Sequence, residues 1–374
     1  MRSKTLPFVF TSFLLFTANI FSQTPETQPT PPDETINIVT EEVHLNVTAQ
    51  TSGGNFVTTL KPDDLLIVEE GAPQKIESMK QVPASVLVLL DTGGNLNFAK
   101  RLDAVRLTAK LFVQNLSSGN GLAVIQSYDK IETVADWTEN KDAIQTALDQ
   151  KLFSGNRSRF ADSVKSAIEI FKSRPLENRH LVFIGDGLDS AASEAERKKA
   201  FQNLLAANIT IHVIAFNKME TARSKGASRD FQIGEERETP RIPDHILDQI
   251  IETMPNLMRD NFRRFMKAER LFIVRLDREA VKLARRKRED WIKSEAELKN
   301  LAEDSGGMFH SPEETETMWV FALDVAKAIG SQYVVTYIPT KSFADSPSGE
   351  ERKVRISTHR DGVQIRSRQK IIVP

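Results

Sequence analysis

The sequence contains no cysteine, and its charges nearly cancel, with 50 Lys and Arg against 51 Asp and Glu in 374 residues. Without cysteine the chain can form no disulfide, thiolate nucleophile or cysteine-ligated zinc site. Because neither sign of charge is in excess, the composition excludes a globally basic nucleic-acid-binding protein and a globally acidic disordered chain. Any metal site must therefore use oxygen or histidine ligands, and any charged partner must meet a local patch.

The common catalytic motifs are also missing. The six histidines, at positions 44, 180, 212, 245, 310 and 359, include no pair four residues apart, which excludes a helical zinc motif. There is no Gly-x-Ser-x-Gly elbow and no phosphate loop ending in Gly-Lys-Ser or Gly-Lys-Thr. His212 is predicted to be a hydrogen-bonded core residue, and Asp186–Asp189 a strand-to-helix turn followed by an N-cap. We therefore expect a protein that is not an enzyme.

Residues 1–22 have the pattern of an export signal. Arg2 and Lys4 precede the mostly apolar run Leu6–Phe16, which is too short to span a membrane. Residues 23–35 then form a Pro-rich linker with almost no apolar side chains. This pattern predicts an exported protein, periplasmic or secreted, without a stable membrane span after signal cleavage. A retained N-terminal anchor is the alternative.

Short apolar alternations predict β-strands at both ends of the folded chain. Four strands are expected within residues 36–83, too few to enclose a core. Their partners are expected within residues 331–374, as strands Gln332–Ile338, Arg352–Thr358 and Val363–Val373. These N- and C-terminal β segments predict a β-sandwich subdomain.

Residues 84–330 instead alternate apolar strands with helices, which predicts an α/β domain with a doubly wound, mostly parallel sheet. In such a sheet the ligand site lies at the carboxyl ends of the strands. The strands are expected at 85–90, 121–127, 181–184, 209–216 and 308–310, and the helices at 98–112, 141–150, 159–172, 193–207 and about 314–329.

An insertion at about 218–290 interrupts this alternation. Lys218–Pro243 has no sustained periodicity and predicts a loop, whereas Ile246–Ala284 has helical spacing. The basic run Arg285–Arg288 is expected to interrupt that helical pattern as a solvated helix face, with a patch for phosphate or an acidic partner as the alternative. A further helix from Ser294 should end at Gly306-Gly307.

Several short motifs occur in a characteristic order. They are Val43–Val47, Val68–Gly71, Asp91–Asn95, Gly185–Gly187, Leu301–Gly307 and Ser331–Tyr333. Together they resemble the bacterial exported proteins with a von Willebrand factor A-type domain, over about residues 37–217 and 294–374. The resemblance implies a Rossmann-like sheet flanked by helices and carried on a β-sandwich.

The resemblance also implies a site for a divalent cation, usually Mg²⁺, built from Asp-x-Ser-x-Ser, a distant Thr and a distant Asp. Carried onto this sequence, the ligands are Asp91, Asn95, Ser158 and Asp186. Gly93 replaces the first serine and supplies no side-chain donor, and Asn95 offers only an amide oxygen. The implied metal-ion-dependent adhesion site is therefore degenerate.

The degenerate site leaves three interpretations open. A weakened site could still bind Mg²⁺, or Asp91 and Asp186 could accept hydrogen bonds from loop amides instead. In the third, Arg157 and Arg159 neutralise the two carboxylates without any metal.

Taken together, these features predict an exported, non-enzymatic protein-binding or adhesion-type module. Its partner-binding residues are expected to be Thr92, Gly93, Gly94 and Gly187, and an acidic side chain of the partner protein would complete the shell of any bound cation. The alternative is a metal-independent structural scaffold that assembles through the helical insertion.

Overall fold

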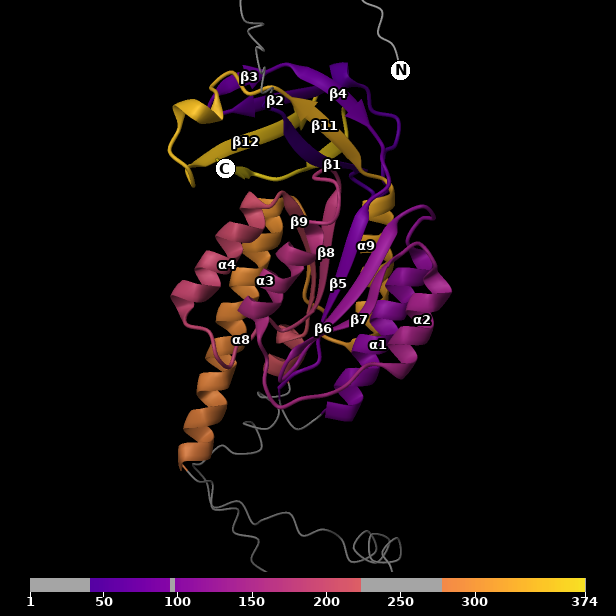
Figure 1. The fold of residues 1–374 in the computed structure, drawn as a ribbon, viewed down its shortest axis with the longest axis vertical. Helices are drawn as coiled ribbons and strands as arrows, with labels where there is room; N and C mark the ends of the chain where they lie inside the picture. Colours follow the sequence, from indigo (N-terminus) through magenta and orange to yellow (C-terminus); the bar gives the residue numbers. More distant parts are fainter. Residues whose placement is uncertain (1–40, 95–97, 223–277, 374) are drawn as a thin grey trace, which may run out of the picture. The chain divides into compact units, whose positions relative to one another are not determined.

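The computed structural model describes residues 41–94, 98–222 and 278–373 (Figure 1). The predicted export signal and linker, Asn95 and most of the predicted insertion lie outside the described residues. In the part of the chain that is described, no helix is both long and apolar enough to cross a membrane.

The central sheet of the described residues has six strands in the order β10-β9-β8-β5-β6-β7. Neighbouring strands are parallel except β6 and β7, which are antiparallel. This confirms the predicted doubly wound, mostly parallel sheet. The strands are β5 (Ser85–Asp91), β6 (Gly121–Ser127), β7 (Ile131–Thr138), β8 (Arg179–Gly185), β9 (Ile209–Ala215) and β10 (Phe309–His310).

Helices cover both faces of this sheet (Figure 1). Because side chains alternate along a strand, Val86, Val88 and Leu90 of β5 face one helical layer while Leu87 and Leu89 face the other. The first layer contains α1 (Phe98–Asn115), α2 (Lys141–Gln150) and α9 (Thr315–Gly330), and the second contains α3 (Phe160–Phe171), α4 (Glu194–Ala206) and α8 (Arg278–Ser305).

Helix α8 corrects the expected interruption at Arg285–Arg288. The basic run lies inside one continuous helix that ends at Ser305. Arginine and lysine are good helix formers, so a run of them does not stop a helix. Arg285 and Arg286 are exposed and Arg288 is half-buried, as expected for a largely solvated helix face.

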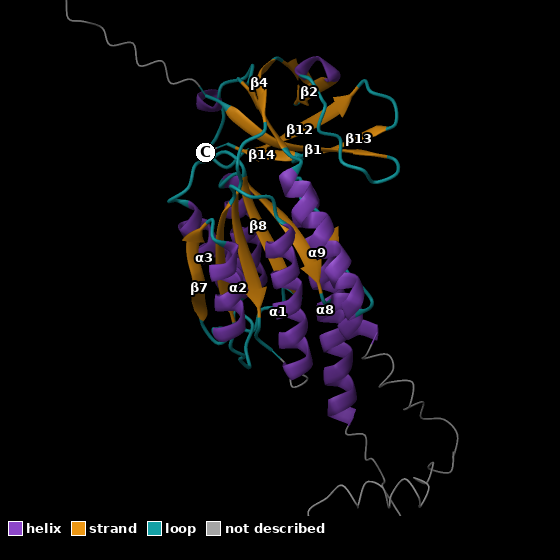
Figure 2. Cartoon of the chain, turned by 90° about the vertical axis from the view of Figure 1, so that its right-hand side faces the viewer, coloured by secondary structure: helices purple, strands orange, loops and turns teal. Residues whose placement is uncertain are grey.

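The N- and C-terminal strands of the described residues form two four-stranded sheets, ordered β13-β1-β11-β4 and β14-β12-β2-β3. Each sheet combines strands from both ends of the chain, as predicted, and Figure 2 shows these strands grouped with only short helical turns among them. The strands are β1 (Val43–Thr51), β2 (Leu65–Glu69), β3 (Ala72–Gln74), β4 (Ile76–Lys80), β11 (Tyr333–Tyr337), β12 (Glu351–Thr358), β13 (Val363–Arg366) and β14 (Lys370–Ile372).

The final strand predicted at Val363–Val373 is in fact two strands. β13 pairs with β1 in one sheet, whereas β14 pairs with β12 in the other. The chain crosses between the sheets at Ser367–Gln369, where Arg368 is buried. The point at which a chain passes from one sheet to another depends on contacts between strands that are distant in sequence. Local alternation of apolar residues does not predict such contacts.

A buried ion pair lies within one sheet of the sandwich, and a tyrosine hydroxyl connects it to the other sheet. Arg352 of β12 donates from Nη1 to Glu69 Oε1 of β2 at 2.9 Å, and the Tyr337 hydroxyl of β11 donates to Glu69 Oε2, also at 2.9 Å. Burial beside the Glu69 carboxylate raises the pKa of Tyr337 far above its usual range. The phenol therefore remains a donor, and it satisfies the second oxygen of the buried carboxylate.

His212 is a hydrogen-bonded core residue, which confirms the prediction. Its Nδ1 accepts from the Met308 amide at 3.2 Å, so its Nε2 carries the proton and donates to His180 Nδ1 at 3.1 Å. His180 Nε2 in turn donates to Asn178 Oδ1 at 2.7 Å. Burial lowers the pKa of His180 to about 3 and also lowers the pKa of His212. Both rings are therefore neutral and fully hydrogen-bonded.

Candidate functional site

The predicted Asp91 and Ser158 lie together at the carboxyl end of β5. Asp91 Oδ1 accepts hydrogen bonds from Ser158 Oγ at 2.7 Å and from the Gly93 amide at 3.1 Å. A Cβ built on Gly185, at the end of β8, would lie only 2.4 Å from Asp91 Cβ. Asp91 thus packs directly against Gly185, the residue that precedes Asp186.

Gly93 marks the departure from the implied cation motif. A Cβ built there would lie 2.0 Å from the carbonyl oxygen of Arg157 and 2.7 Å from its carbonyl carbon. Backbone atoms cannot yield as a flexible side chain does, so no serine fits at this position without moving the neighbouring loop. Backbone atoms of the Arg157 loop fill the space that a serine side chain would need.

Asp186 is held by its own loop and by α8. Its Oδ1 accepts from the Leu188 amide at 3.0 Å, and its backbone oxygen accepts from Ser294 Oγ at 2.7 Å. Gly187 has a φ of +64°, and a Cβ built on it would lie 2.8 Å from Leu298 of α8. The end of β8 is therefore covered by α8.

Two further carboxylates, which the sequence analysis did not predict as site residues, connect the loops. Asp189 accepts from the Ala161 amide in the first turn of α3 at 2.8 Å, and from the Ala191 and Ala192 amides at 2.9 Å each. Asp129, in the turn after β6, accepts from the Asn156 and Arg157 amides at 3.1 and 3.0 Å. Aspartates often bind nearby amides in turns, but these contacts to distant loops depend on the tertiary fold.

The third interpretation, neutralisation by arginine, finds no ion pair from Arg157 or Arg159 to Asp91 or Asp186 among the described residues. Arg159 pairs with Asp162 in the first turn of α3, at 2.9 Å, rather than with the carboxylates at the strand ends. The Arg157 side chain is exposed. The guanidinium of Arg159 is thus engaged on α3, where its partner is three residues away on the same helix.

Most of the predicted partner-binding residues are buried. Thr92, Gly93 and Gly187 are buried, and Gly94 is half-buried. The exposed surface beside them instead carries Phe153, whose side chain is 56% exposed, and Arg157. A single exposed phenylalanine has no sequence signature, because its burial depends on the whole fold.

The described residues do not fit the implied cation. They offer the carboxylates of Asp91 and Asp186 and the hydroxyl of Ser158, and one oxygen of each carboxylate already accepts a loop amide. A hard cation needs several free oxygen donors, and at Gly93 backbone atoms fill the space where another ligand would stand.

The pattern of the von Willebrand factor type A domain matches residues 86–188. A comparison with curated proteins found no match. Among solved structures, a von Willebrand factor type A protein from Catenulispora acidiphila is 11% identical, with a TM-score of 0.42, and the match covers 89% of this chain and 74% of that one.

Two other structures are similar at the same low level. An aerotolerance-related membrane protein from Bacteroides fragilis is 12% identical, with a TM-score of 0.38, over 66% of this chain and 98% of that one. Proximal thread matrix protein 1 from the mussel byssus is 17% identical, with a TM-score of 0.33, over 36% of this chain and 38% of that one.

In a second mussel structure the match covers 49% of the mussel chain, so this chain spans less than half of that protein. At these scores the similarities carry no argument about function. The family pattern, together with the sheet order and the loops at the strand ends, assigns residues 86–188 to a von Willebrand factor type A-related domain.

Proposed function

We propose that this chain is an exported, non-enzymatic protein-binding module, and that its partner binds the loops at the carboxyl ends of β5, β6 and β8. The observation that carries the proposal is the exposed pair Phe153 and Arg157. Their loop is held by Asp129, which accepts a hydrogen bond from the Arg157 amide. Phenylalanine and arginine are enriched at protein interfaces, and arginine is among the residues that often dominate binding energy.

Backbone hydrogen bonds hold the loop of Phe153 and Arg157 in place, so this loop could bind a partner without changing its conformation. Gly155 donates to the Thr92 carbonyl at 3.3 Å, and Ser190 donates to the Ser158 carbonyl at 2.9 Å. These bonds tie the loop of Phe153 and Arg157 to the ends of β5 and β8. A loop held in one conformation loses less conformational entropy when a partner binds.

The proposed surface works without a cation. The loop amides and the Ser158 hydroxyl donate to Asp91 and Asp186 where the implied family site would place a metal. Binding would then rest on the aromatic side chain of Phe153 and the guanidinium of Arg157. An acidic group on the partner is the natural counterpart of that guanidinium.

Affinity capture tests this surface. The full chain is immobilised and exposed to envelope and extracellular proteins of the source cells, beside the double variant Phe153→Ala/Arg157→Ala. We expect the double variant to lose a specific captured protein by at least about tenfold, and chelation to leave capture unchanged. Leu176→Ala is the matched control, because Leu176 is 59% exposed and precedes the opposite end of β8.

Two outcomes would contradict the proposal. If Phe153→Ala/Arg157→Ala still retained the captured protein, this surface would not be the binding site. Capture that survives that variant but fails when residues 223–277 are deleted would favour the structural scaffold that assembles through the insertion. The deletion stops before Arg278 because α8 begins there and packs against the Asp186 loop.

A further inference from the structure

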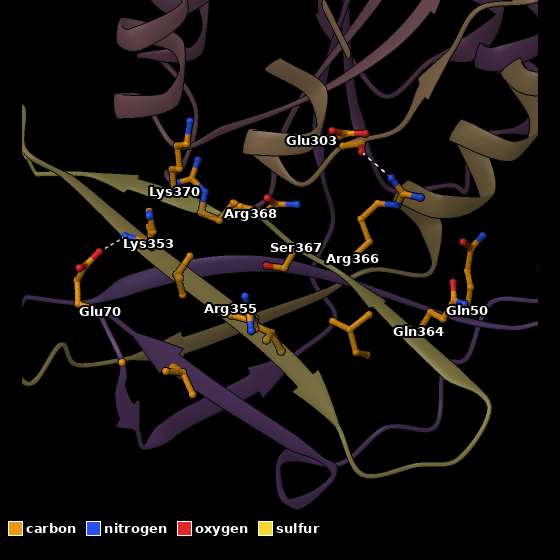
Figure 3. Close-up of a pocket in the computed structure, with 17 residues that line it drawn as sticks. Gln50, Glu70, Glu303, Lys353, Arg355, Gln364, Arg366, Ser367, Arg368 and Lys370 are labelled. Atoms are coloured by element: carbon orange, nitrogen blue, oxygen red, sulfur yellow. Dashed lines mark hydrogen bonds between the residues drawn. The ribbon is translucent and has the colours of Figure 1, made fainter. Parts of the chain in front are cut away.

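A groove on the β-sandwich has no part in the proposed function. It has a volume of about 930 Å³, and residues of β12, β13 and the crossing segment between β13 and β14 line it (Figure 3). Small-molecule sites have volumes of about 300–1,000 Å³, so the groove is large enough for a compact ligand. Its cationic side chains are Lys353, Arg355, Arg366, Arg368 and Lys370, and its acidic side chains are Glu70 and Glu303.

Most of these cations have no carboxylate partner among the described residues. Lys370 pairs with Asp304 at 2.7 Å, whereas in the described ranges no carboxylate lies within ion-pair distance of the other cations. Glu70 and Glu303 line the groove without forming such a pair. Glu70 accepts a hydrogen bond from the Lys353 backbone amide and not from its ammonium group. The groove therefore has a positive field.

Two arginines of the groove donate to neutral backbone acceptors. Arg366 Nη1 donates to the Gly307 carbonyl at 3.1 Å, and Arg368 Nη2 donates to the Leu205 carbonyl at 3.4 Å. Arg368 is only 6% exposed. Burial lowers the pKa of Arg368 to about 10, which still leaves its guanidinium charged at neutral pH. A buried cation without a carboxylate is costly, so an anion that binds in the groove would relieve part of that cost.

Lys353 and Arg355 are exposed cations of this groove. Their side chains lie on one face of β12, because residues two apart in a strand point the same way, and their Cα atoms are about 7 Å apart. Val68 of β2, the cross-strand neighbour of Arg355, lies on the same face. Within the described strands and loops, neither cationic group has a hydrogen bond or an ion pair. Both are therefore free to contact a ligand.

Neutral polar side chains line another part of the groove. Gln50 of β1 and Gln364 of β13 are cross-strand partners, and Gln369 belongs to the crossing segment. A glutamine amide offers both donors and an acceptor, which suits the hydroxyl groups of a ligand. None of the described lining residues is aromatic, so they offer no stacking surface for a nucleotide base. The lining therefore favours an anionic ligand that also carries hydroxyl groups.

We propose that this groove binds a compact, hydroxyl-bearing ligand with two phosphate groups, such as a sugar bisphosphate. A phosphate monoester carries a charge of about −1.5 to −2 at neutral pH, so two of them offset several cations within a small volume. One phosphate contacts Lys353 and Arg355, the second lies near Arg366, and the glutamine amides bind the hydroxyl groups. This site is distinct from the loop that carries Phe153 and Arg157, so either proposal can fail alone.

Isothermal titration calorimetry tests the groove with glucose 1,6-bisphosphate as the probe. We expect the full chain to bind it saturably, at least about tenfold more tightly than inorganic phosphate, and more weakly as salt is added. Arg355→Glu should weaken binding by at least about tenfold. Lys198→Glu, an exposed charge reversal on α4, is the matched control and should bind as the parent does. Thermal melts check that each variant folds, and Lys353→Glu replaces Arg355→Glu if the latter does not.

Further probes separate the proposed ligand from simple charge attraction. Gln364→Ala should weaken binding of the bisphosphate and leave binding of pyrophosphate, which has no hydroxyl groups on carbon, unchanged. Citrate or a Glu-rich peptide that binds more tightly than the bisphosphate would overturn the proposal in favour of a carboxylate ligand or a protein partner. The absence of saturable binding to the parent, or an unchanged affinity in Arg355→Glu, would also overturn it.

Discussion

Replacing Arg352 with methionine should lower the free energy of unfolding by about 3–5 kcal/mol. The change leaves the Glu69 carboxylate, only 4% exposed, without its cation. It also removes the hydrogen bonds from Arg352 to the carbonyls of Lys341 and Ser342, at 2.7 and 2.8 Å. Chemical denaturation monitored by circular dichroism measures the loss.

The matched control for this change is Arg355→Met. Arg355 lies three residues along the same strand but is exposed and has no ion pair among the described residues, so its loss should cost less than about 0.5 kcal/mol. The double variant Arg352→Met/Glu69→Leu should recover part of the lost stability, because it removes the uncompensated charge. A loss below about 1 kcal/mol for Arg352→Met would show that the pair is not buried as described.

The variant Gly93→Ser restores the family's residue in sequence but should destabilise the fold by about 1–3 kcal/mol. The new Cβ would lie 2.0 Å from the Arg157 carbonyl oxygen, so the loop that carries Phe153 must move. Urea denaturation measures the loss, and thermal melts with and without Mg²⁺ show whether the added hydroxyl creates a cation site.

Gly53→Ser is the control for this substitution. Gly53 lies in a turn where a built Cβ meets no atom closer than 3.8 Å, so serine should be tolerated there. A Gly93→Ser variant that is as stable as the parent and gains stability with Mg²⁺ would contradict the account, because ligand binding to the folded state alone raises stability.

Regular elements with buried apolar runs could be predicted from the sequence almost to the residue. Strand β6 and helix α2 have the bounds that their patterns predict. Strand β7 was missed because it is a half-exposed edge strand with one fully buried side chain, Val134, and therefore has little apolar pattern. The division between β13 and β14 was missed because both segments look extended locally and only their distant partners differ.

The parts of the site that depend only on the order of strands and helices could be predicted from the sequence. Parallel strands bring their carboxyl ends to one edge, so the contact between Asp91 and Ser158 follows from the order of the elements. The roles of Asp129 and Asp189 depend on which amides other loops present, and no local pattern encodes that. The ion pair of Arg159 was also missed. Arg159 pairs with Asp162, three residues along the chain, and not with the expected carboxylates, because a residue at this helical spacing lies within reach of its side chain.

Calorimetric titration of Mg²⁺ and Mn²⁺ into the full chain tests the central claim most directly, namely that protein donors occupy the place of a cation at the strand ends. Asp91→Asn is titrated in parallel, and thermal melts confirm that both proteins are folded. The account predicts no saturable binding heat in either protein. Saturable binding in the parent that Asp91→Asn abolishes would contradict it.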